Sequence, residues 1–307
     1  MVSGCGRGSD SLFSAGTSPG PRTAYPPPNH DTISLSDLNT NPSLRPPLHN
    51  PALTVVSQLG RRTVEFAAEL GRFGQLVGRV VSEIGGVFRE RALFIQECVT
   101  LGVESLPLVL LVGLFTGAVS GWQGHYQFEG YLPYELIGPG TFKAVVLELG
   151  PVLTALIIAG RVSASIAAEL GTMKVTEQID ALETMAISSV RYLAVPRVAA
   201  MTVMMPVLTA QAIFIAMMGA SFVCTVLLGM TPNQFWGLIP NFFKLYDVFA
   251  GLLKSVFFGL SASLLGCYIG FRTEGGAEGV GMATITAFVW SCLTILVIDF
   301  LLALMLF

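Results

Sequence analysis

The chain has 307 residues, of which 52% are hydrophobic and only 12% are charged, and its mean hydropathy is +0.67. A soluble domain is about 25% charged, so this composition is typical of a protein that crosses a membrane several times. The formal net charge of −3 argues against a nucleic-acid partner. The five cysteines have no C-x-x-C spacing, so neither a disulfide framework nor a zinc site is expected.

Residues 1–50 are predicted to form a disordered tail. They are rich in Ser, Pro, Gly and Asn, and two proline runs exclude helix. The segment lacks the apolar core of a secretory signal. A plastid transit peptide would be rich in Ser and poor in acids, and Asp10, Asp31 and Asp37 weigh against it. A cytoplasmic tail is therefore preferred to a transit peptide.

Residues 51–98 are predicted to form amphipathic helices at the membrane surface. Six arginines between Arg61 and Arg91 alternate with apolar residues such as Phe66, Leu70 and Phe73. A helix with one basic and one apolar face lies in the headgroup plane of an anionic leaflet. A separate soluble domain is excluded because so short a segment cannot support its own core.

Residues 99–307 are predicted to be an all-α transmembrane domain. About 20 consecutive apolar residues suffice to cross a bilayer, and about five stretches meet this length. The spans are expected near residues 106–121, 142–168, 198–230, 248–271 and 282–307. The fold class is therefore a polytopic all-α membrane protein with an interfacial N-terminal helix.

The Lys and Arg distribution predicts the orientation of the spans. With a cytoplasmic N-terminus, the inner segments hold 11 basic residues, whereas the outer loops hold only Lys143 and Lys244. Positive residues accumulate on the cytoplasmic side of membrane proteins. The C-terminus is therefore expected on the opposite side.

Four charged residues stand out inside the predicted spans, where charge is costly and often functional. Glu148, Lys254 and Asp299 fall at a similar depth and are predicted to form a cluster. Such a cluster would either hold the helices in position or take part in conformational switching, and the sequence leaves both roles open. Arg161 lies near the inner end of the second span, where its side chain can reach the interface.

A polar stretch, residues 171–186, follows the second span. An apolar face and acidic positions alternate with helical periodicity, and Thr176 is a candidate N-cap with acids in the first turn. The stretch is predicted to form a short acidic helix outside the membrane. It would serve either as a docking element for a partner or as a solvated connector.

Two rows of small residues precede this stretch, Gly160, Ala164, Ala168 and Ser163, Ala167, Gly171. Small residues four apart allow helices to pack closely in lipid. The run Gly259–Ser263 is similar to the serine motif of rhomboid proteases, but no histidine follows it to act as a base. Helix packing is therefore the preferred interpretation of that run as well.

The run ELGPVLTALIIAGRVSASIAAELGTMKVTEQIDALETM, Glu148–Met185, resembles the signature of the MlaE (YrbE) permeases. These proteins are the membrane subunits of Mce-type ABC transporters, which move lipids between membranes. The resemblance extends from about Leu70 to Phe307. It implies that residues 99–307 are an MlaE-like permease domain.

The resemblance also implies partners and sites. It implies a homodimer that binds an ABC ATPase through the 171–186 helix, with an Mce-domain substrate-binding protein outside and an STAS-domain protein on the ATPase. It implies a phospholipid held between protomers, near the outer ends of spans one and five. The implied ATPase-coupling residues are Thr172, Val175, Glu177, Ile179, Asp180, Leu182, Glu183 and Met185. The implied lipid path includes Leu114, Val119, Trp122 and Tyr126.

No G-x-x-x-x-G-K-[ST] motif is present, so ATP and Mg²⁺ are expected on the partner ATPase, and this chain is expected to be no enzyme and to bind no cofactor. An ATPase-independent secondary transporter or exporter of a hydrophobic small molecule is the alternative function. A membrane scaffold is a third possibility. A Gram-negative inner membrane is the expected location, with the plastid inner envelope as the alternative.

Overall fold

The structure is a computed structural model that describes residues 51–85, 91–128, 130 and 133–306. The predicted tail, residues 1–50, lies outside the described residues, as does Arg89. The chain divides into two units, Met1–Arg62 and Thr63–Phe307, and every contact described below lies within the second. All regular elements among the described residues are helices, which confirms the all-α prediction.

Five helical runs in the described part of the chain are long and apolar enough to cross a membrane, which confirms the predicted number. They are Arg91–Gln127, Tyr134–Val175, Val190–Val226, Leu245–Gly270 and Gly276–Leu306. The first span was expected to start near Leu106, but its helical run starts at Arg91 because the apolar residues after Arg91 continue the helix. The segment 51–98 is therefore divided between a separate amphipathic helix and the start of span one.

The first two spans contain several helical segments in succession. The amphipathic helix is α2 (Pro51–Glu83). Span one consists of α3 (Arg91–Glu97), η3 (Cys98–Gly102), η4 (Val103–Ser105) and α4 (Leu106–Phe128). Span two consists of η5 (Tyr134–Leu136), α5 (Ile137–Ala144), η6 (Val145–Leu149), α6 (Gly150–Ile158), η7 (Ala159–Ser163) and α7 (Ala164–Val175).

The remaining elements are more regular. After α8 (Gln178–Thr184), span three is η8 (Val190–Ala194) with α9 (Val195–Val226). Two short helices follow, α10 (Pro232–Trp236) and α11 (Ile239–Phe242), and the last spans are α12 (Leu245–Gly270) and α13 (Gly276–Leu306). A Thr231–Gln234 capping box starts α10, because each side chain bonds to the other residue's backbone N–H.

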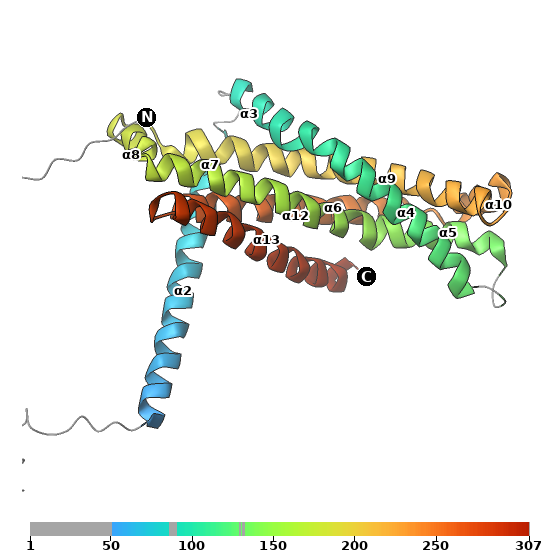
Figure 1. Cartoon of the computed structure of the whole chain (residues 1–307), viewed down its shortest axis with the longest axis horizontal. Helices are drawn as coiled ribbons and strands as arrows, with labels where there is room; N and C mark the ends of the chain where they lie inside the picture. Colours follow the sequence, from blue (N-terminus) through green and yellow to red (C-terminus); the bar gives the residue numbers. More distant parts are fainter. Residues whose placement is uncertain (1–50, 86–90, 129, 131–132, 307) are drawn as a thin grey trace, which may run out of the picture. The chain divides into compact units, whose positions relative to one another are not determined.

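The long helices pack side by side, with α9 against α4 and α12, and with α12 also against α7 and α13 (Figure 1). Small residues allow this close approach. A side chain at Gly117 of α4 would collide with the backbone of Ala216 in α9, and one at Gly266 of α12 would press on Ser163. Without a hydrophobic effect between helices in lipid, such contacts gain dispersion energy from close packing.

One of the two small-residue rows of span two is confirmed as a packing surface. Ser163, Ala167 and Gly171 are buried, and this row faces α12 at Gly266 and Gly270. The run Gly259–Ser263 has the same role, since Gly259 packs against Met201 and Met205 of α9. The hydroxyls of Ser261 and Ser263 donate to carbonyl oxygens of their own helix.

The apolar face of α2 is divided between two environments. Phe73, Leu76 and Val77 pack against the bundle core, and Val80 is only 2% exposed. Leu70 is 62% exposed. The C-terminal half of α2 is thus attached to the bundle, and the predicted position of the helix in the headgroup plane stays a prediction.

The predicted single helix at 171–186 is wrong. Helix α7 continues from span two to Val175, and α8 starts only at Gln178. Thr176 caps the C-terminus of α7 and is not an N-cap, because its hydroxyl donates to the carbonyl of Thr172. Glu177 follows with a left-handed φ of 61°, which turns the chain before α8.

Candidate functional site

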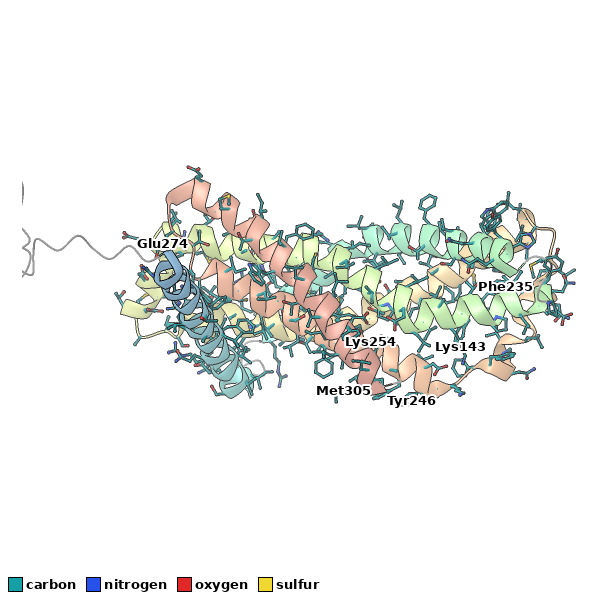
Figure 2. The ribbon with its side chains drawn as sticks, turned by 90° about the horizontal axis from the view of Figure 1, so that it is seen from below. Lys143, Phe235, Tyr246, Lys254, Glu274 and Met305 are labelled. Atoms are coloured by element: carbon teal, nitrogen blue, oxygen red, sulfur yellow. The ribbon has the colours of Figure 1, made fainter. Side chains whose placement is uncertain are left out.

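An ion cluster joins three spans at the middle of the bundle. Lys254 of α12 places its Nζ 2.7 Å from Oε1 of Glu148 in η6 and 3.0 Å from Oδ1 of Asp299 in α13. The Lys254 ammonium also donates to the carbonyl of Leu147 at 3.4 Å. Figure 2 places Lys254 between Glu274 at one end of the bundle and Phe235 at the other. The predicted cluster is therefore present, and its role stays a proposal.

The three members differ in their exposure. The Lys254 side chain is 0% exposed, that of Asp299 is 19% exposed and that of Glu148 is 46% exposed. Because a buried ammonium without a partner is very costly, both carboxylates stabilise it here. One ammonium is shared by two carboxylates, and the more exposed of the two is that of Glu148.

The two residues of span two that were predicted as intramembrane charges, Glu148 and Arg161, both lie in π-helical segments. Glu148 lies in η6 and Arg161 in η7, on either side of α6. A π-helical turn inserts a residue into an α-helix and is frequent at functional sites. Pro151, at the start of α6, removes one backbone donor just after η6, consistent with the local departure from α-helical pairing.

Arg161 is not part of the cluster. Its guanidinium donates to the Ser105 hydroxyl at 2.6 Å and lies 3.1 Å from Oε2 of Glu104, both in η4 of span one. Arg161 therefore connects span two to span one. The sequence predicted instead that its side chain extends toward the membrane–water interface.

A second buried ion network was missed by sequence reasoning. Arg197 of α9 is 6% exposed and lies 3.2 Å from Glu97 of α3 and 2.9 Å from Glu169 of α7. Its Nη1 also donates to the carbonyl of Leu193 at 3.1 Å. The available signal was one charged residue near the same end of each of three spans, as charges in spans seek partners.

An open groove runs along one face of α4. Its volume is ≈ 450 Å³, and it is lined by Leu111, Val112, Phe115, Thr116, Val119, Ser120, Gln123, Leu149 and Leu153. Thr116, Ser120 and Gln123 are spaced three to four residues apart, so they form a polar stripe on an otherwise apolar wall. Leu149 follows Glu148 directly, so the groove adjoins the ion cluster.

The groove agrees only in part with the expected lipid path. Of the four expected residues, Val119 lines it, while Leu114, Trp122 and Tyr126 are exposed elsewhere on α4, at 40%, 51% and 76%. The groove lies between spans one and two. The expected cleft between protomers near spans one and five stays a prediction.

The coupling segment, residues 171–187, begins in the last turns of α7, includes α8 and extends the predicted 171–186 stretch by Ile187. Ile179 is 3% exposed and Leu182 packs against the bundle core, so these two residues anchor α8 to its own chain. Their expected burial in a partner is thus wrong for Ile179, whose side chain is already covered. The apolar residues that the segment does expose are Val175 at 36%, Met185 at 61% and Ile187 at 41%.

The polar residues of the coupling segment brace α8. Asp180 accepts from Lys174 at 2.7 Å, and Glu183 accepts from the buried Ser189 at 2.9 Å. Thr172 and Glu177 are exposed. Left-handed φ angles at Glu177 and Ala186 enclose α8, so its orientation is set by two backbone conformations that are uncommon without glycine.

Among the described residues, no three His, Cys, Asp or Glu side chains gather closely enough to hold a metal ion. The Cys267 thiol is fully buried. The arrangement is that of a helical bundle with an internal ion cluster, a lateral groove and an exposed segment at one end.

Known proteins align with most of the length of this chain. The family model for Permease MlaE matches residues 94–305. A probable ABC transporter permease protein of Synechocystis sp. is 40% identical over 234 residues, covering 76% of this chain and 88% of its own. The intermembrane phospholipid transport system permease protein MlaE of Haemophilus influenzae is 34% identical over 258 residues, covering 82% and 97%. Protein TRIGALACTOSYLDIACYLGLYCEROL 1, chloroplastic, of Arabidopsis thaliana is 32% identical over 230 residues, covering 75% and 65%.

Proposed function

Because this chain belongs to the MlaE permease family, we propose that it is the membrane subunit of an ABC transporter that moves phospholipids between membranes. The observation that carries this proposal is the family match over residues 94–305, which covers all five spans almost completely. A relative that is aligned over nearly its whole length is named for intermembrane phospholipid transport. The lateral groove supports the proposal, since an apolar wall with a polar stripe suits an acyl chain attached to a polar headgroup.

The ATPase is proposed to bind the coupling segment. The exposed apolar residues Val175, Met185 and Ile187 would enter its groove, and Glu177 would meet basic residues at the rim. Apolar residues that are exposed in the free subunit and become buried at the centre of an interface carry most of the affinity, whereas charges at the rim tune the rate of association. ATP hydrolysis and its Mg²⁺ are assigned to that partner. This chain would supply the path and not the chemistry.

The permease is proposed to act as a homodimer that cooperates with an Mce-domain protein, with an STAS-domain protein on the ATPase. Helix α13 supports the dimer proposal. Its buried residues form a single row, Ala283, Ala287, Ser291 and Ile295. Most of its other large apolar residues are exposed. Lipid or a second copy of the chain would cover them. Cross-linking of two protomers through α13 would test this, and a monomeric active complex would contradict it.

The N-terminus is proposed to face the cytoplasm. Two observations support this proposal: an odd number of spans would put the two chain termini on opposite sides of the membrane, and the basic residues are concentrated on the coupling-segment side. The bacterial inner membrane is the proposed location, and the chloroplastic relative keeps the plastid inner envelope as the alternative. A reporter fused after Phe307 should be active only outside the cytoplasm, and cytoplasmic activity would reverse the assignment.

The test of the proposed function is purification of the permease from its own organism. A stoichiometric ABC ATPase should copurify, and the complex in proteoliposomes should move a fluorescent phospholipid only when ATP is hydrolysed. A permease that transports without any ATPase would instead support a secondary transporter. A non-hydrolysable ATP analogue is the control for nucleotide binding alone.

A further inference from the structure

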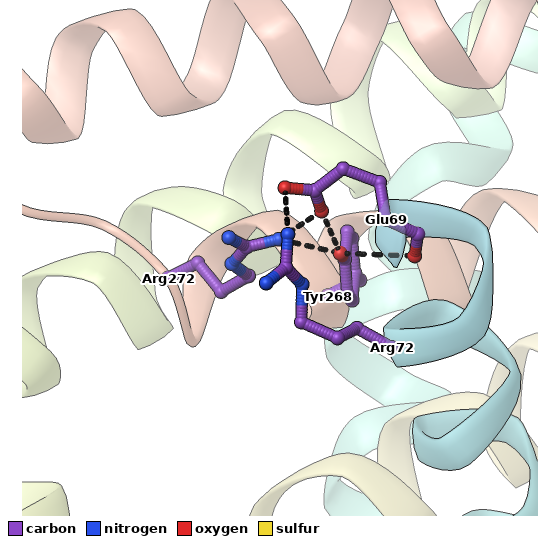
Figure 3. A network of polar contacts seen from close by, with 4 residues as sticks. All are labelled: Glu69, Arg72, Tyr268 and Arg272. Atoms are coloured by element: carbon purple, nitrogen blue, oxygen red, sulfur yellow. Dashed lines mark hydrogen bonds and ion pairs between the residues drawn. The ribbon is translucent and has the colours of Figure 1, made fainter. Parts of the chain in front are cut away.

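A polar network joins α2 to the end of α12 (Figure 3). The hydroxyl of Tyr268 and Nη1 of Arg272 both donate to Oε2 of Glu69, and Arg72 donates to Oε1 at 2.6 Å. The Tyr268 ring packs edge-on against Phe73 at 5.4 Å between centroids, and the Arg272 guanidinium lies 5.3 Å from the same ring. One carboxylate of α2 thus receives three donors, and two of them come from another part of the chain.

The Glu69 carboxylate stays charged in this network. The donor from Arg272, then that from Tyr268, lowers the pKa of Glu69 to about 2 from its usual 4.5. Charge-assisted hydrogen bonds of this kind are about twice as strong as neutral ones. The contact therefore persists across the physiological pH range and is not a proton-operated switch.

Apolar packing supports the same contact. Phe73, Leu76 and Val77 lie against the bundle core, and Val80 is buried, so the helix is docked along two further turns. A helix that only rested on the lipid surface would leave this face in contact with lipid. The second half of α2 is therefore a structural part of the permease bundle.

The last residue of α2 contacts the residue that directly follows the coupling segment. The Ser188 hydroxyl lies 3.3 Å from each carboxylate oxygen of Glu83, the last residue of α2, and Ser188 directly follows the coupling segment. Helix α2 therefore connects the residue after the coupling segment to the end of α12. The same end of α12 also contacts α7, because Thr273 packs closely on Gly171.

Helix α12 continues from this network to the ion cluster without interruption. Tyr268 and Lys254 belong to the same helix, which contains no proline. At 1.5 Å per residue, their 14-residue separation is roughly 21 Å along the axis. A displacement of α12 at Tyr268 would therefore also move Lys254, because one continuous helix holds both residues.

On the basis of the proposed function, we infer that Glu69, Tyr268 and Arg272 are positioning residues of the transport cycle. They hold α2 to α12, so that movement of the coupling segment by the ATPase reaches the Lys254 cluster through α2 as well as through α7. The ATPase would thus act on the membrane domain through two linked paths.

The test uses the permease–ATPase complex in proteoliposomes and measures phospholipid moved per ATP hydrolysed. Glu69→Gln keeps the shape and removes the charge, and Tyr268→Phe keeps the ring against Phe73 and removes only the hydroxyl. Both variants should assemble with normal amounts of ATPase and hydrolyse ATP, while the lipid moved per ATP falls several-fold. The matched control is Glu135→Gln, the same substitution at an exposed glutamate of η5, which should behave as the wild type.

Exchanging the charges of Glu69 and Arg272 tests whether their contact positions α2 during transport or only stabilises the fold. Glu69→Arg combined with Arg272→Glu restores the pair in reverse and should recover part of the lipid moved per ATP, whereas each single reversal should not. Normal lipid transport per ATP in both Glu69→Gln and Tyr268→Phe would overturn the inference and leave the proposed function intact. Equal losses in the single reversals and the exchange would also overturn it. A wild-type complex that moves no phospholipid would overturn both.

Discussion

Helix α12 and the residues just past its end carry two ion clusters, which differ chiefly in their exposure to water. Lys254 lies inside α12 and its side chain is 0% exposed between Glu148 and Asp299. Arg272 lies two residues past the helix and is 43% exposed beside Glu69, which is also 43% exposed. Both clusters connect helices that are far apart in the sequence. One does so inside the bundle, and the other does so at a surface that water reaches.

The comparison shows that burial determines how much stability is lost when one partner of an ion pair is removed. Around Lys254 the effective dielectric is low, so removal of the lysine leaves Glu148 and Asp299 without the ammonium that they share. Around Arg272, water and salt replace a lost partner at little cost. The buried cluster should therefore govern stability, whereas the exposed network should govern how helices move together.

The largest effect is expected at the buried cluster. Lys254→Ala leaves Glu148 and Asp299 facing each other, and loss of one partner of a buried pair costs roughly 3–5 kcal/mol. Thermal unfolding of the purified protein should show this loss, and Lys244→Ala, an exposed lysine, should show none. Adding Asp299→Asn to Lys254→Ala should recover part of the stability. Strict additivity of the two substitutions would mean that the residues do not act as a cluster.

A second effect compares buried and exposed apolar residues within the coupling segment. Ile179→Ala should destabilise the chain by roughly 2–4 kcal/mol, because it leaves a cavity beneath α8. Met185→Ala should leave unfolding unchanged but should weaken retention of the ATPase during purification, since its side chain is 61% exposed. Thermal unfolding and ATPase stoichiometry should thus separate the two variants. If Met185→Ala retains the ATPase fully, the segment is a connector at that position.

A smaller effect is expected at the exposed network. Arg272→Gln should lower stability by less than about 1 kcal/mol, because exposed ion pairs contribute little. The loss should shrink further in high salt, where charges near the surface are screened. The loss in Lys254→Ala should be nearly the same at low and high salt. A salt-independent loss in Arg272→Gln would mean that its network is shielded from solvent.

The smallest effect is the dependence of the network on pH. Folding lowers the pKa of Glu69 to about 2 from its usual 4.5, chiefly because Arg272 donates to it. The stabilisation is therefore complete above about pH 4.5 and is lost as the pH falls toward 2. The stability difference between wild type and Glu69→Gln should be constant from pH 7 to 5 and should decrease below 4.5. A difference that already decreases near pH 6 would assign the effect to another group.

Much of the membrane domain follows from local sequence. Span number follows from hydropathy, because a run of apolar residues must be long enough to cross the bilayer whatever its neighbours are. The Lys254 cluster was also predictable. Charges at equal depth in different spans have few alternatives to one another, since lipid offers them no partner.

Other features depended on contacts that no local pattern encodes. Sequence periodicity indicated one helix at 171–186, but the chain turns at Glu177, and Ile179 faces its own bundle. The Arg197 network was missed because each of its residues lies near a span end, where a charge could equally well reach water.

The sequence by itself determined five candidate spans, an all-α domain and three charges at one depth. Only the tertiary structure decided that the second half of α2 packs on the bundle and that Glu69 meets Tyr268 and Arg272. The physical reason is that the apolar face of an amphipathic helix looks the same whether lipid or protein covers it. Which of the two covers it depends on the side chains of other helices, and these lie about 200 residues away along the chain.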